Sequence, residues 1–218
     1  MNIYTNVKEI LSSLPKHVML EAAAKTRTVE EIETAIDAGV KIIGENYLQE
    51  AEDVIPLIGG KARWHYIGQL QSGKIKRIVE LFDLVETVGS TRHAEMIDEQ
   101  AGKRGIIMPI LVEVNSGREE QKAGVYPEDA VGLVRDISPM ENVIVTGLMT
   151  MGRYSSDENV VRSCFRETRS LFDELNAMGL PNVKMSYLSM GMSSSYPHAI
   201  SEGANLIRVG EAIFGPRK

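Results

Sequence analysis

Cysteine is nearly absent from this chain of 218 residues, which contains Cys164 alone. A single cysteine excludes a disulfide framework and a cysteine-rich metal site. The chain has four histidines, His17, His65, His93 and His198, and their positions show no metal-ligand spacing. The sequence therefore predicts no metal site.

Long apolar runs and an excess of basic residues are also missing. No apolar run approaches the roughly 20 residues that span a bilayer, and the amino terminus, MNIYTNVKEILSSLPKHV, has no basic region followed by an apolar stretch. We therefore expect a cytoplasmic protein without a membrane partner. The formal net charge is -6, and Lys and Arg are scattered among acids, which argues against a general nucleic-acid binder.

The chain does contain a repeated alternation of short apolar, β-branched runs with amphipathic stretches. The alternation continues from one end to the other without a Pro-, Gly- or Ser-rich linker, so we expect a single domain over residues 1–218. Eight runs have the character of strands: Val18–Ala24, Val40–Gly44, Trp64–Gly68, Asp83–Val88, Ile106–Val114, Val143–Met149, Val183–Met190 and Asn205–Gly210.

The stretches between these runs have the pattern of helices. In TVEEIETAIDAG, for example, Thr28 and Glu31 have the spacing of a capping box, and Gly39 is placed to end the helix. Eight strands that are each followed by a helix predict an α/β fold, a single (β/α)8 barrel of the TIM type. The alternative is a doubly wound open sheet, which would carry a Gly-rich turn after its first strand, whereas this chain has AAAKTRT there.

In such a barrel the active face is built where strands end and loops begin, and Lys25 directly follows the first predicted strand. Partial desolvation and nearby cations at the barrel mouth would lower the pKa of this lysine and favour the neutral amine that a Schiff base requires. The alternative is an ordinary surface lysine at a strand end.

Two loops near the end of the chain are suited to bind phosphate. Small and hydroxyl residues follow the seventh strand in SMGMSSSYP, residues 189–197, and RVGEAIFG, residues 208–215, closes the eighth. Barrels often bind phosphate at these two loops, through backbone N–H groups at a helix start. Gly and Ser can also simply make turns, but their presence in both loops favours phosphate.

Other polar residues follow the middle strands. Asn46 could hydrogen-bond a phenolate or a ring oxygen, and His65 is either a proton carrier or, as we interpret it, a histidine satisfied within the core. Glu113 and Asn115 close the fifth strand, and Lys122 lies in the polar loop NSGREEQKAG, where side chains are usually just solvated.

Six stretches together resemble one known family. They are AAAKTRTVEEIETAIDAG, GENYLQE, WHYIGQLQSGK, VEVNSGREEQKAG, GLMTMG and LSMGMSSSYPHAISEGANLIRVGEAIFG. In order and over nearly the whole chain, they are similar to the pyridoxal phosphate homeostasis proteins, also called proline synthase co-transcribed homologues. The resemblance implies a barrel like the amino-terminal domain of bacterial alanine racemase, the PLP fold type III, with pyridoxal 5'-phosphate (PLP) bound. It also implies a role in PLP homeostasis and amino-acid and keto-acid balance, without established turnover.

The resemblance also implies a role for particular residues. Lys25 would hold PLP as an internal aldimine, and Arg208 would lie near the pyridine nitrogen. The other expected cofactor-binding residues are Asn46 beside the ring and Ser193, Gly210 and Glu211 at the phosphate, with Ser189 as a neighbour.

The chain departs from the family pattern at three positions. Gln69 stands where relatives often have His, Gly73 where they often have Asn, and Arg27 where many have Lys. The first two put a particular hydrogen bond in doubt, and the third removes a possible alternative amine. None of them affects Lys25.

These observations favour a PLP carrier or regulator that is not an enzyme, with PLP-dependent apo-enzymes as possible partners and a monomeric state. A cationic Arg208 would keep the pyridine nitrogen unprotonated and weaken PLP as an electron sink. The alternative is a PLP-dependent amino-acid racemase or related enzyme, but the racemases need a second base, a Tyr from an additional domain that we expect to be absent. A third interpretation is a barrel enzyme acting on a sugar phosphate, in which Lys25 has no special role.

Overall fold

A computed structural model describes residues 2–216 as a closed barrel of eight parallel strands. The strands are β1 (Met19–Ala23), β2 (Ile42–Glu45), β3 (Arg63–Tyr66), β4 (Leu84–Val88), β5 (Met108–Glu113), β6 (Val143–Thr150), β7 (Val183–Met190) and β8 (Leu206–Val209). Each strand pairs with the next in the sequence, and β8 pairs with β1 to close the ring. The (β/α)8 prediction is confirmed, and the open-sheet alternative is wrong.

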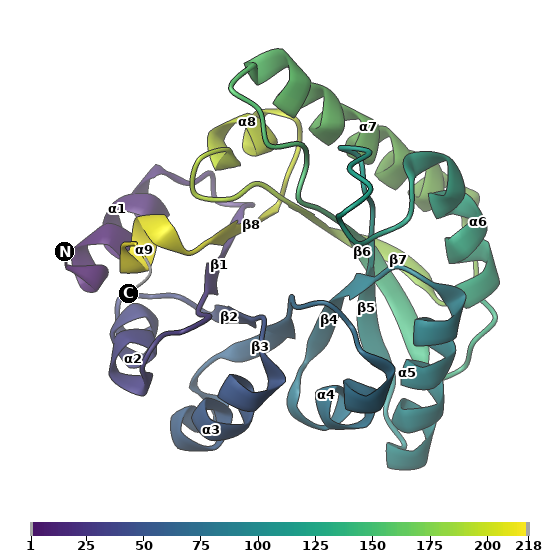
Figure 1. The fold of residues 1–218 in the computed structure, drawn as a ribbon, viewed down its shortest axis with the longest axis horizontal. Helices are drawn as coiled ribbons and strands as arrows, with labels where there is room; N and C mark the ends of the chain where they lie inside the picture. Colours follow the sequence, from purple (N-terminus) through teal and green to yellow (C-terminus); the bar gives the residue numbers. More distant parts are fainter. Residues whose placement is uncertain (1, 217–218) are drawn as a thin grey trace.

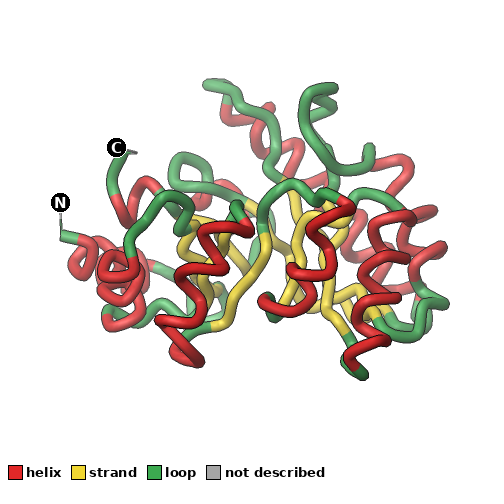
Figure 2. Tube along the Cα trace, turned by 60° about the horizontal axis from the view of Figure 1, so that its bottom comes forward, coloured by secondary structure: helices red, strands yellow, loops and turns green. Residues whose placement is uncertain are grey.

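The helices surround the strands, as Figure 1 shows from one end of the barrel and Figure 2 from the side. They are α1 (Ile3–Ser13), α2 (Val29–Asp37), α3 (Leu48–Ile58), α4 (Ile75–Leu81), α5 (Thr91–Arg104), α6 (Pro127–Ile137), α7 (Glu158–Met178), α8 (Tyr196–Ser201) and α9 (Glu211–Phe214). Two short 3-10 helices, η1 (Gly59–Lys61) and η2 (Ser72–Lys74), precede β3 and α4. Within residues 2–216, no helix has the length and apolar character needed to cross a membrane.

The predicted capping box forms at the start of α2. Glu31 N donates to Thr28 Oγ1 at 3.3 Å, and Thr28 N donates to Glu31 Oε2 at 3.0 Å. Gly39 follows the helix with a φ of 119°, a conformation that side chains rarely allow, so the chain can turn directly into β2. The capping box and the Gly39 turn define the two ends of α2, the helix in the connection between Lys25 and β2.

Side chains on each strand alternate between the helix layer and the barrel interior. On β1, Leu20 and Ala22 are buried in the main hydrophobic core that the strands share with the helices. A second, smaller apolar cluster of Leu84, Leu111 and Met149 is joined by Tyr187. Since alternation places Glu21 on the other side of β1 from its two neighbours, this carboxyl group is committed to the barrel interior.

Candidate functional site

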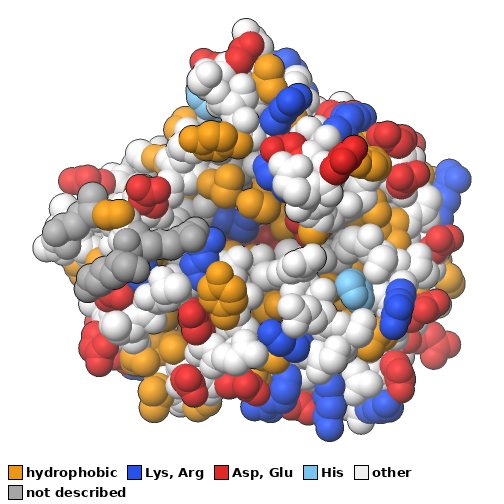
Figure 3. Space-filling view, in the orientation of Figure 1, with side chains coloured by type: hydrophobic (Ala, Val, Ile, Leu, Met, Phe, Trp, Pro, Cys, Tyr) orange, Lys and Arg blue, Asp and Glu red, His pale blue; other side chains and the backbone are white. Residues whose placement is uncertain are grey.

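The carboxyl ends of β1 and β8 bring Lys25 close to the loop after Val209. The register pairs Glu21 with Arg208 and Ala22 with Val209, so the two chains leave the sheet as neighbours. A cavity of about 160 Å³ lies between them. It is lined by Ala23, Lys25, Arg27, Gly210, Glu211, Gly215 and Pro216. The face of the molecule in Figure 3 is hollowed near its centre, where Lys or Arg atoms lie beside hydrophobic atoms.

The backbone directly after Lys25 is strained. Thr26 has a φ of 63°, which is a rare conformation for a β-branched residue, and its N–H donates to Glu50 Oε2 at 2.7 Å. Arg27 then donates to Gly215 O at 2.7 Å, which ties the turn to the end of α9. The half-buried Lys25 is thus held between a strand and a turn whose path is set by α3 and α9.

The loops after β7 and β8 meet beside this cavity. Ala212 N, in the first turn of α9, donates to Ser193 Oγ at 3.2 Å, so the hydroxyl lies at the start of that helix. A Cβ added at Gly210 would come within 3.2 Å of Ala23 O, which shows how closely the two strand ends approach. Glu211 is the first residue of α9, and its side chain is exposed. The structure therefore brings Ser193, Gly210 and Glu211 together, as the sequence predicts for an anion-binding loop.

Asn46 follows β2, two strand ends away from Arg208. Its Nδ2 donates to Ile67 O at 3.3 Å, while its Oδ1 is buried without a hydrogen-bond partner among the residues that the structure describes. A buried acceptor without a donor is costly unless a ligand or water supplies one. This side chain is therefore preorganised to accept a hydrogen bond.

Arg208 lies deeper in the barrel, with 5% of its surface exposed. Its Nη2 donates to Thr150 O at 2.8 Å, and its Nη1 donates to Ser189 Oγ. Ser189 is fully buried and donates in turn to Glu86 Oε2 at 2.7 Å. The structure thus places Ser189 between Arg208 and Glu86. Its hydroxyl accepts a hydrogen bond from the first and donates one to the second.

Next to Ser189 lies a cluster of three ionisable side chains. Their spacing in the sequence does not predict that they come together. His65 Nδ1 lies 2.9 Å from Glu86 Oε1 and 3.4 Å from Glu21 Oε2. All three residues are at most 1% exposed, and both carboxylate oxygens of Glu21 have no hydrogen-bond partner among residues 2–216. One ligand atom from each residue lies within 4.8 Å of the others, so the same three groups could also hold a metal ion.

Burial and mutual charge perturb the pKa of each group in this cluster. Burial, together with the charge of Glu86, raises the pKa of Glu21 to about 8. Burial alone would lower the pKa of His65, but its interactions with Glu21 and Glu86 outweigh burial and raise the pKa to about 10. Burial also opposes ionisation of Glu86, but His65 and Arg208 outweigh it and lower this pKa. Near neutral pH the cluster therefore holds a neutral Glu21, a cationic His65 and an anionic Glu86.

These shifts predict that the protein loses stability as the pH rises, through Glu21 between 4.5 and about 8 and through His65 between 6.5 and about 10. Glu21 and His65 bind their protons more tightly in the folded state than in the unfolded state. Their contribution to the free energy of unfolding is present at low pH and is lost as each group deprotonates. Urea unfolding curves at pH values from about 6 to about 10 measure this loss. Glu21→Gln should make the part below about pH 8 less steep, because an amide does not titrate. A stability that rises throughout this range would contradict the assignment.

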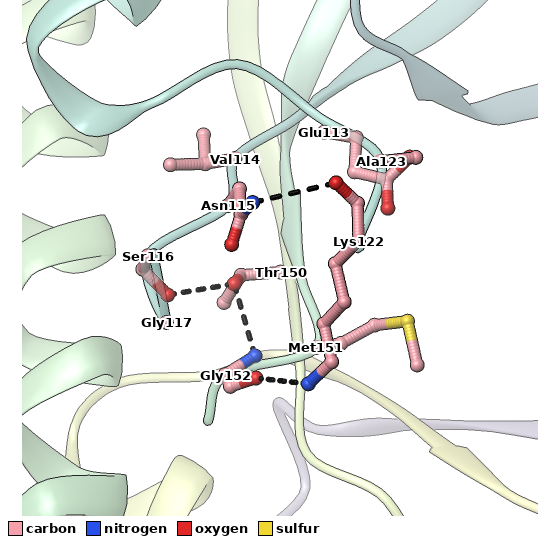
Figure 4. A pocket seen from close by; sticks show the side chains of 10 residues that line it. All are labelled: Glu113, Val114, Asn115, Ser116, Gly117, Lys122, Ala123, Thr150, Met151 and Gly152. Atoms are coloured by element: carbon pink, nitrogen blue, oxygen red, sulfur yellow. Dashed lines mark hydrogen bonds between the residues drawn. The ribbon is translucent and has the colours of Figure 1, made fainter. Parts of the chain in front are cut away.

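Lys122 belongs to a separate group of contacts at the ends of β5 and β6, shown in Figure 4. Its amine donates to Gly152 O at 3.0 Å and pairs with Glu119. The pocket beside it has a volume of about 10 Å³, room for about one water molecule. Lys122 therefore bridges two loops within the protein.

Comparison with known proteins shows the family to which this barrel belongs. Residues 1–218 match the family model described as the alanine racemase N-terminal domain. A protein of Aquifex aeolicus is 38% identical over 200 residues, which cover 91% of this chain and 87% of the relative, and one of Haemophilus influenzae is 34% identical over 203 residues, covering 92% and 85%. Both are named pyridoxal phosphate homeostasis protein.

The chain belongs to the pyridoxal phosphate homeostasis protein family. Solved structures extend the comparison of this homeostasis protein. PipY of Synechococcus elongatus, solved with PLP bound, superposes with a TM-score of 0.90 at 32% identity, covering 98% of this chain and all of PipY. Alanine racemase of Clostridium difficile has a TM-score of 0.86 at 16% identity, and the match covers 99% of this chain but 57% of the racemase. At that identity the racemase shares the barrel fold.

Proposed function

We propose that residues 1–218 form one PLP-binding barrel domain that holds the cofactor on Lys25 and serves PLP homeostasis and amino-acid and keto-acid balance. The observation that carries the proposal is the meeting of Lys25 with the Ser193 and Gly210 loops. The amine and the first residues of α9 line the same cavity of about 160 Å³, on neighbouring strands. A primary amine beside an anion-binding loop suits a phosphorylated aldehyde.

The residues present fit PLP in further respects. The unpartnered Oδ1 of Asn46 can accept a hydrogen bond, and the absence of a Cβ at Gly210 lets backbone approach the anion. PLP supplies an aldehyde that amines bind covalently and a ring that can withdraw electrons. Of this chain's groups, Lys25 would bind the aldehyde, Ser193 and the N–H groups of Gly210 and Glu211 the phosphate, and Arg208 would face the ring nitrogen. Ser189 acts through Arg208.

A carrier or regulator without turnover is the function that these residues support better than a racemase. Arg208 is a fixed cation with two hydrogen bonds inside the protein, so it would keep a proton off a nitrogen that it faces. Removing a proton from a bound amino acid is then poorly stabilised. PLP-dependent apo-enzymes are the proposed recipients. The monomeric state and the cytoplasmic location stay predictions.

Retention and transfer of PLP test this function. The protein loaded with PLP is expected to keep about one equivalent through desalting, as a visible absorption band, and to activate a PLP-dependent apo-enzyme in proportion to that amount. Free PLP at the same concentration is the control for transfer. A protein that shows no band and keeps no PLP would contradict the proposal and favour the sugar-phosphate enzyme. Stereochemical inversion of alanine at typical enzymatic rates, on the order of 1 per second or faster, would favour the racemase.

A further inference from the structure

A continuous series of buried side chains lies in the interior of the barrel. We name the series Arg208, Ser189, Glu86, His65 and Glu21 the buried relay. Its members come from β8, β7, β4, β3 and β1, and its two ends lie on neighbouring strands, since the register of β1 with β8 pairs Glu21 with Arg208. The contacts proposed for PLP involve Arg208, and Ser189 through it, and they leave Glu86, His65 and Glu21 without a role.

The inner contacts of the relay are short and specific. Arg208 donates to Ser189, Ser189 donates to Glu86 at 2.7 Å, and His65 lies 2.9 Å from the second oxygen of Glu86. The guanidinium also lies 3.7 Å from Glu86 Oε2. Both oxygens of this carboxylate are therefore in contact: Oε2 with Ser189 and the guanidinium, and Oε1 with His65.

Arg208 is too deeply buried for water to solvate its charge. Burying a cation without a counter-charge is strongly unfavourable. Two further groups face the guanidinium: the carbonyl of Thr150, which is neutral, and the carboxyl of Glu113, whose pKa is raised to about 7 by burial although the charge of Arg208 lowers it. Among the relay members, Glu86 is the anion at neutral pH, because burial keeps Glu21 protonated.

We propose that Glu86 is a positioning residue that holds the Arg208 guanidinium in place through Ser189, with His65 in contact with the other oxygen of its carboxylate. The proposal rests on the proposed function, since it assigns Arg208 the ring nitrogen of PLP as its partner. A guanidinium held by Ser189 and by the carbonyl of Thr150 keeps its remaining N–H groups in a fixed orientation. Glu86 thereby acts on the cofactor without touching it.

Substitutions at different members of the relay have different expected effects on PLP release, which allows a matched comparison. Glu86→Gln removes the charge that compensates Arg208, while Glu21→Gln replaces a carboxyl group that is already neutral by an amide of the same shape. In the PLP-loaded protein, Glu86→Gln is expected to release PLP about tenfold faster or more, the effect of losing a charge-assisted hydrogen bond. Glu21→Gln should stay within about twofold of the unmodified protein. Ser189→Ala breaks the link but keeps the charge, so its release rate should fall between these two.

A second readout separates positioning from a structural role. When Arg208 is no longer fixed, the ring nitrogen of PLP can gain a proton, so the visible band of Glu86→Gln should change with pH over a range near neutrality. The band of the unmodified protein and of Glu21→Gln should not change over this range. Loss of packing alone would lower the melting temperature without producing this pH dependence.

Each outcome decides between the alternatives. Equal release rates and equal spectra for Glu86→Gln and the unmodified protein would overturn the positioning role, as would equal losses in Glu86→Gln and Glu21→Gln. A stoichiometric metal ion held by Glu21, His65 and Glu86, detected by elemental analysis, would also overturn it, because a metal would replace the proton of His65. If Glu86→Gln does not fold, a Ser189→Ala protein with unchanged release and spectrum would overturn the role equally. If the unmodified protein retains no PLP, the proposed function itself fails.

Discussion

Lys25→Ala is expected to abolish the visible absorption band of the PLP-loaded protein and to let PLP pass out on desalting. Among residues 2–216, the Lys25 amine is the group lining the cavity of about 160 Å³ that can bind an aldehyde covalently beside the α9 loop. The phosphate contacts would survive, so weak and reversible binding should persist. Because Lys25 is half-buried at a strand end, its loss should change the free energy of unfolding by about 1 kcal/mol or less.

The control for this experiment is Lys122→Ala. The Lys122 amine bonds Gly152 O and Glu119, in a different set of loops, so its removal should leave the band intact. Reduction with borohydride followed by peptide mapping locates the pyridoxyl group directly. A label found mainly on Lys122 or another lysine would show that the assignment of Lys25 is wrong.

Gly44→Ala is expected to have the largest effect on stability. Gly44 pairs with Ala23 and with His65, and a Cβ at this position would overlap with Glu21 Oε1 and come within 2.8 Å of Ile67 Cδ1. The carboxyl group is fully buried and has little room to move. The expected loss is about 3 kcal/mol, which corresponds to a fall of roughly 6–12 °C in the melting temperature.

Gly73→Ala is the matched control, since the same methyl group added there meets nothing within 4 Å. Its melting temperature should be unchanged or slightly raised, because alanine restricts the unfolded chain. Calorimetry of the two variants measures the difference. A Gly44→Ala protein as stable as Gly73→Ala would show that the core around Glu21 is loosely packed.

The eight strands and their order could be predicted from the sequence because each strand is a short apolar run between amphipathic helices. The order of strands around a parallel barrel then follows from chain connectivity. The neighbourhood of Lys25 and Gly210 could also be predicted, since strand ends of a barrel meet on one face. Contacts within that face, such as Ser193 with Ala212, depend on loop conformations that have no periodic signal.

The relay could not be predicted in the same way. Glu21 and Glu86 each occur singly in an apolar run, VMLEAAA and DLVETV, where one acid does not interrupt the pattern of a strand. The sequence favours a His65 whose hydrogen bonds are satisfied within the core. In the structure, Glu86 is the partner of its Nδ1. The available signal is that all three residues occupy interior positions of their strands. Only the closed barrel brings strands that are far apart in the sequence within hydrogen-bonding distance.

Pairing of β8 with β1 has a consequence for biosynthesis. Lys25 lies near the beginning of the chain, whereas the loop that meets it follows the last strand, and Asn6 of α1 donates to Ile213 O in α9 at 2.9 Å. On the ribosome, the early strands emerge long before β8, and β1 is then an unpaired edge. A nascent chain therefore carries the amine without the phosphate-binding loop from the emergence of β1 until the emergence of β8. Capture of the cofactor becomes possible only when the ring closes, which couples loading to the completion of folding.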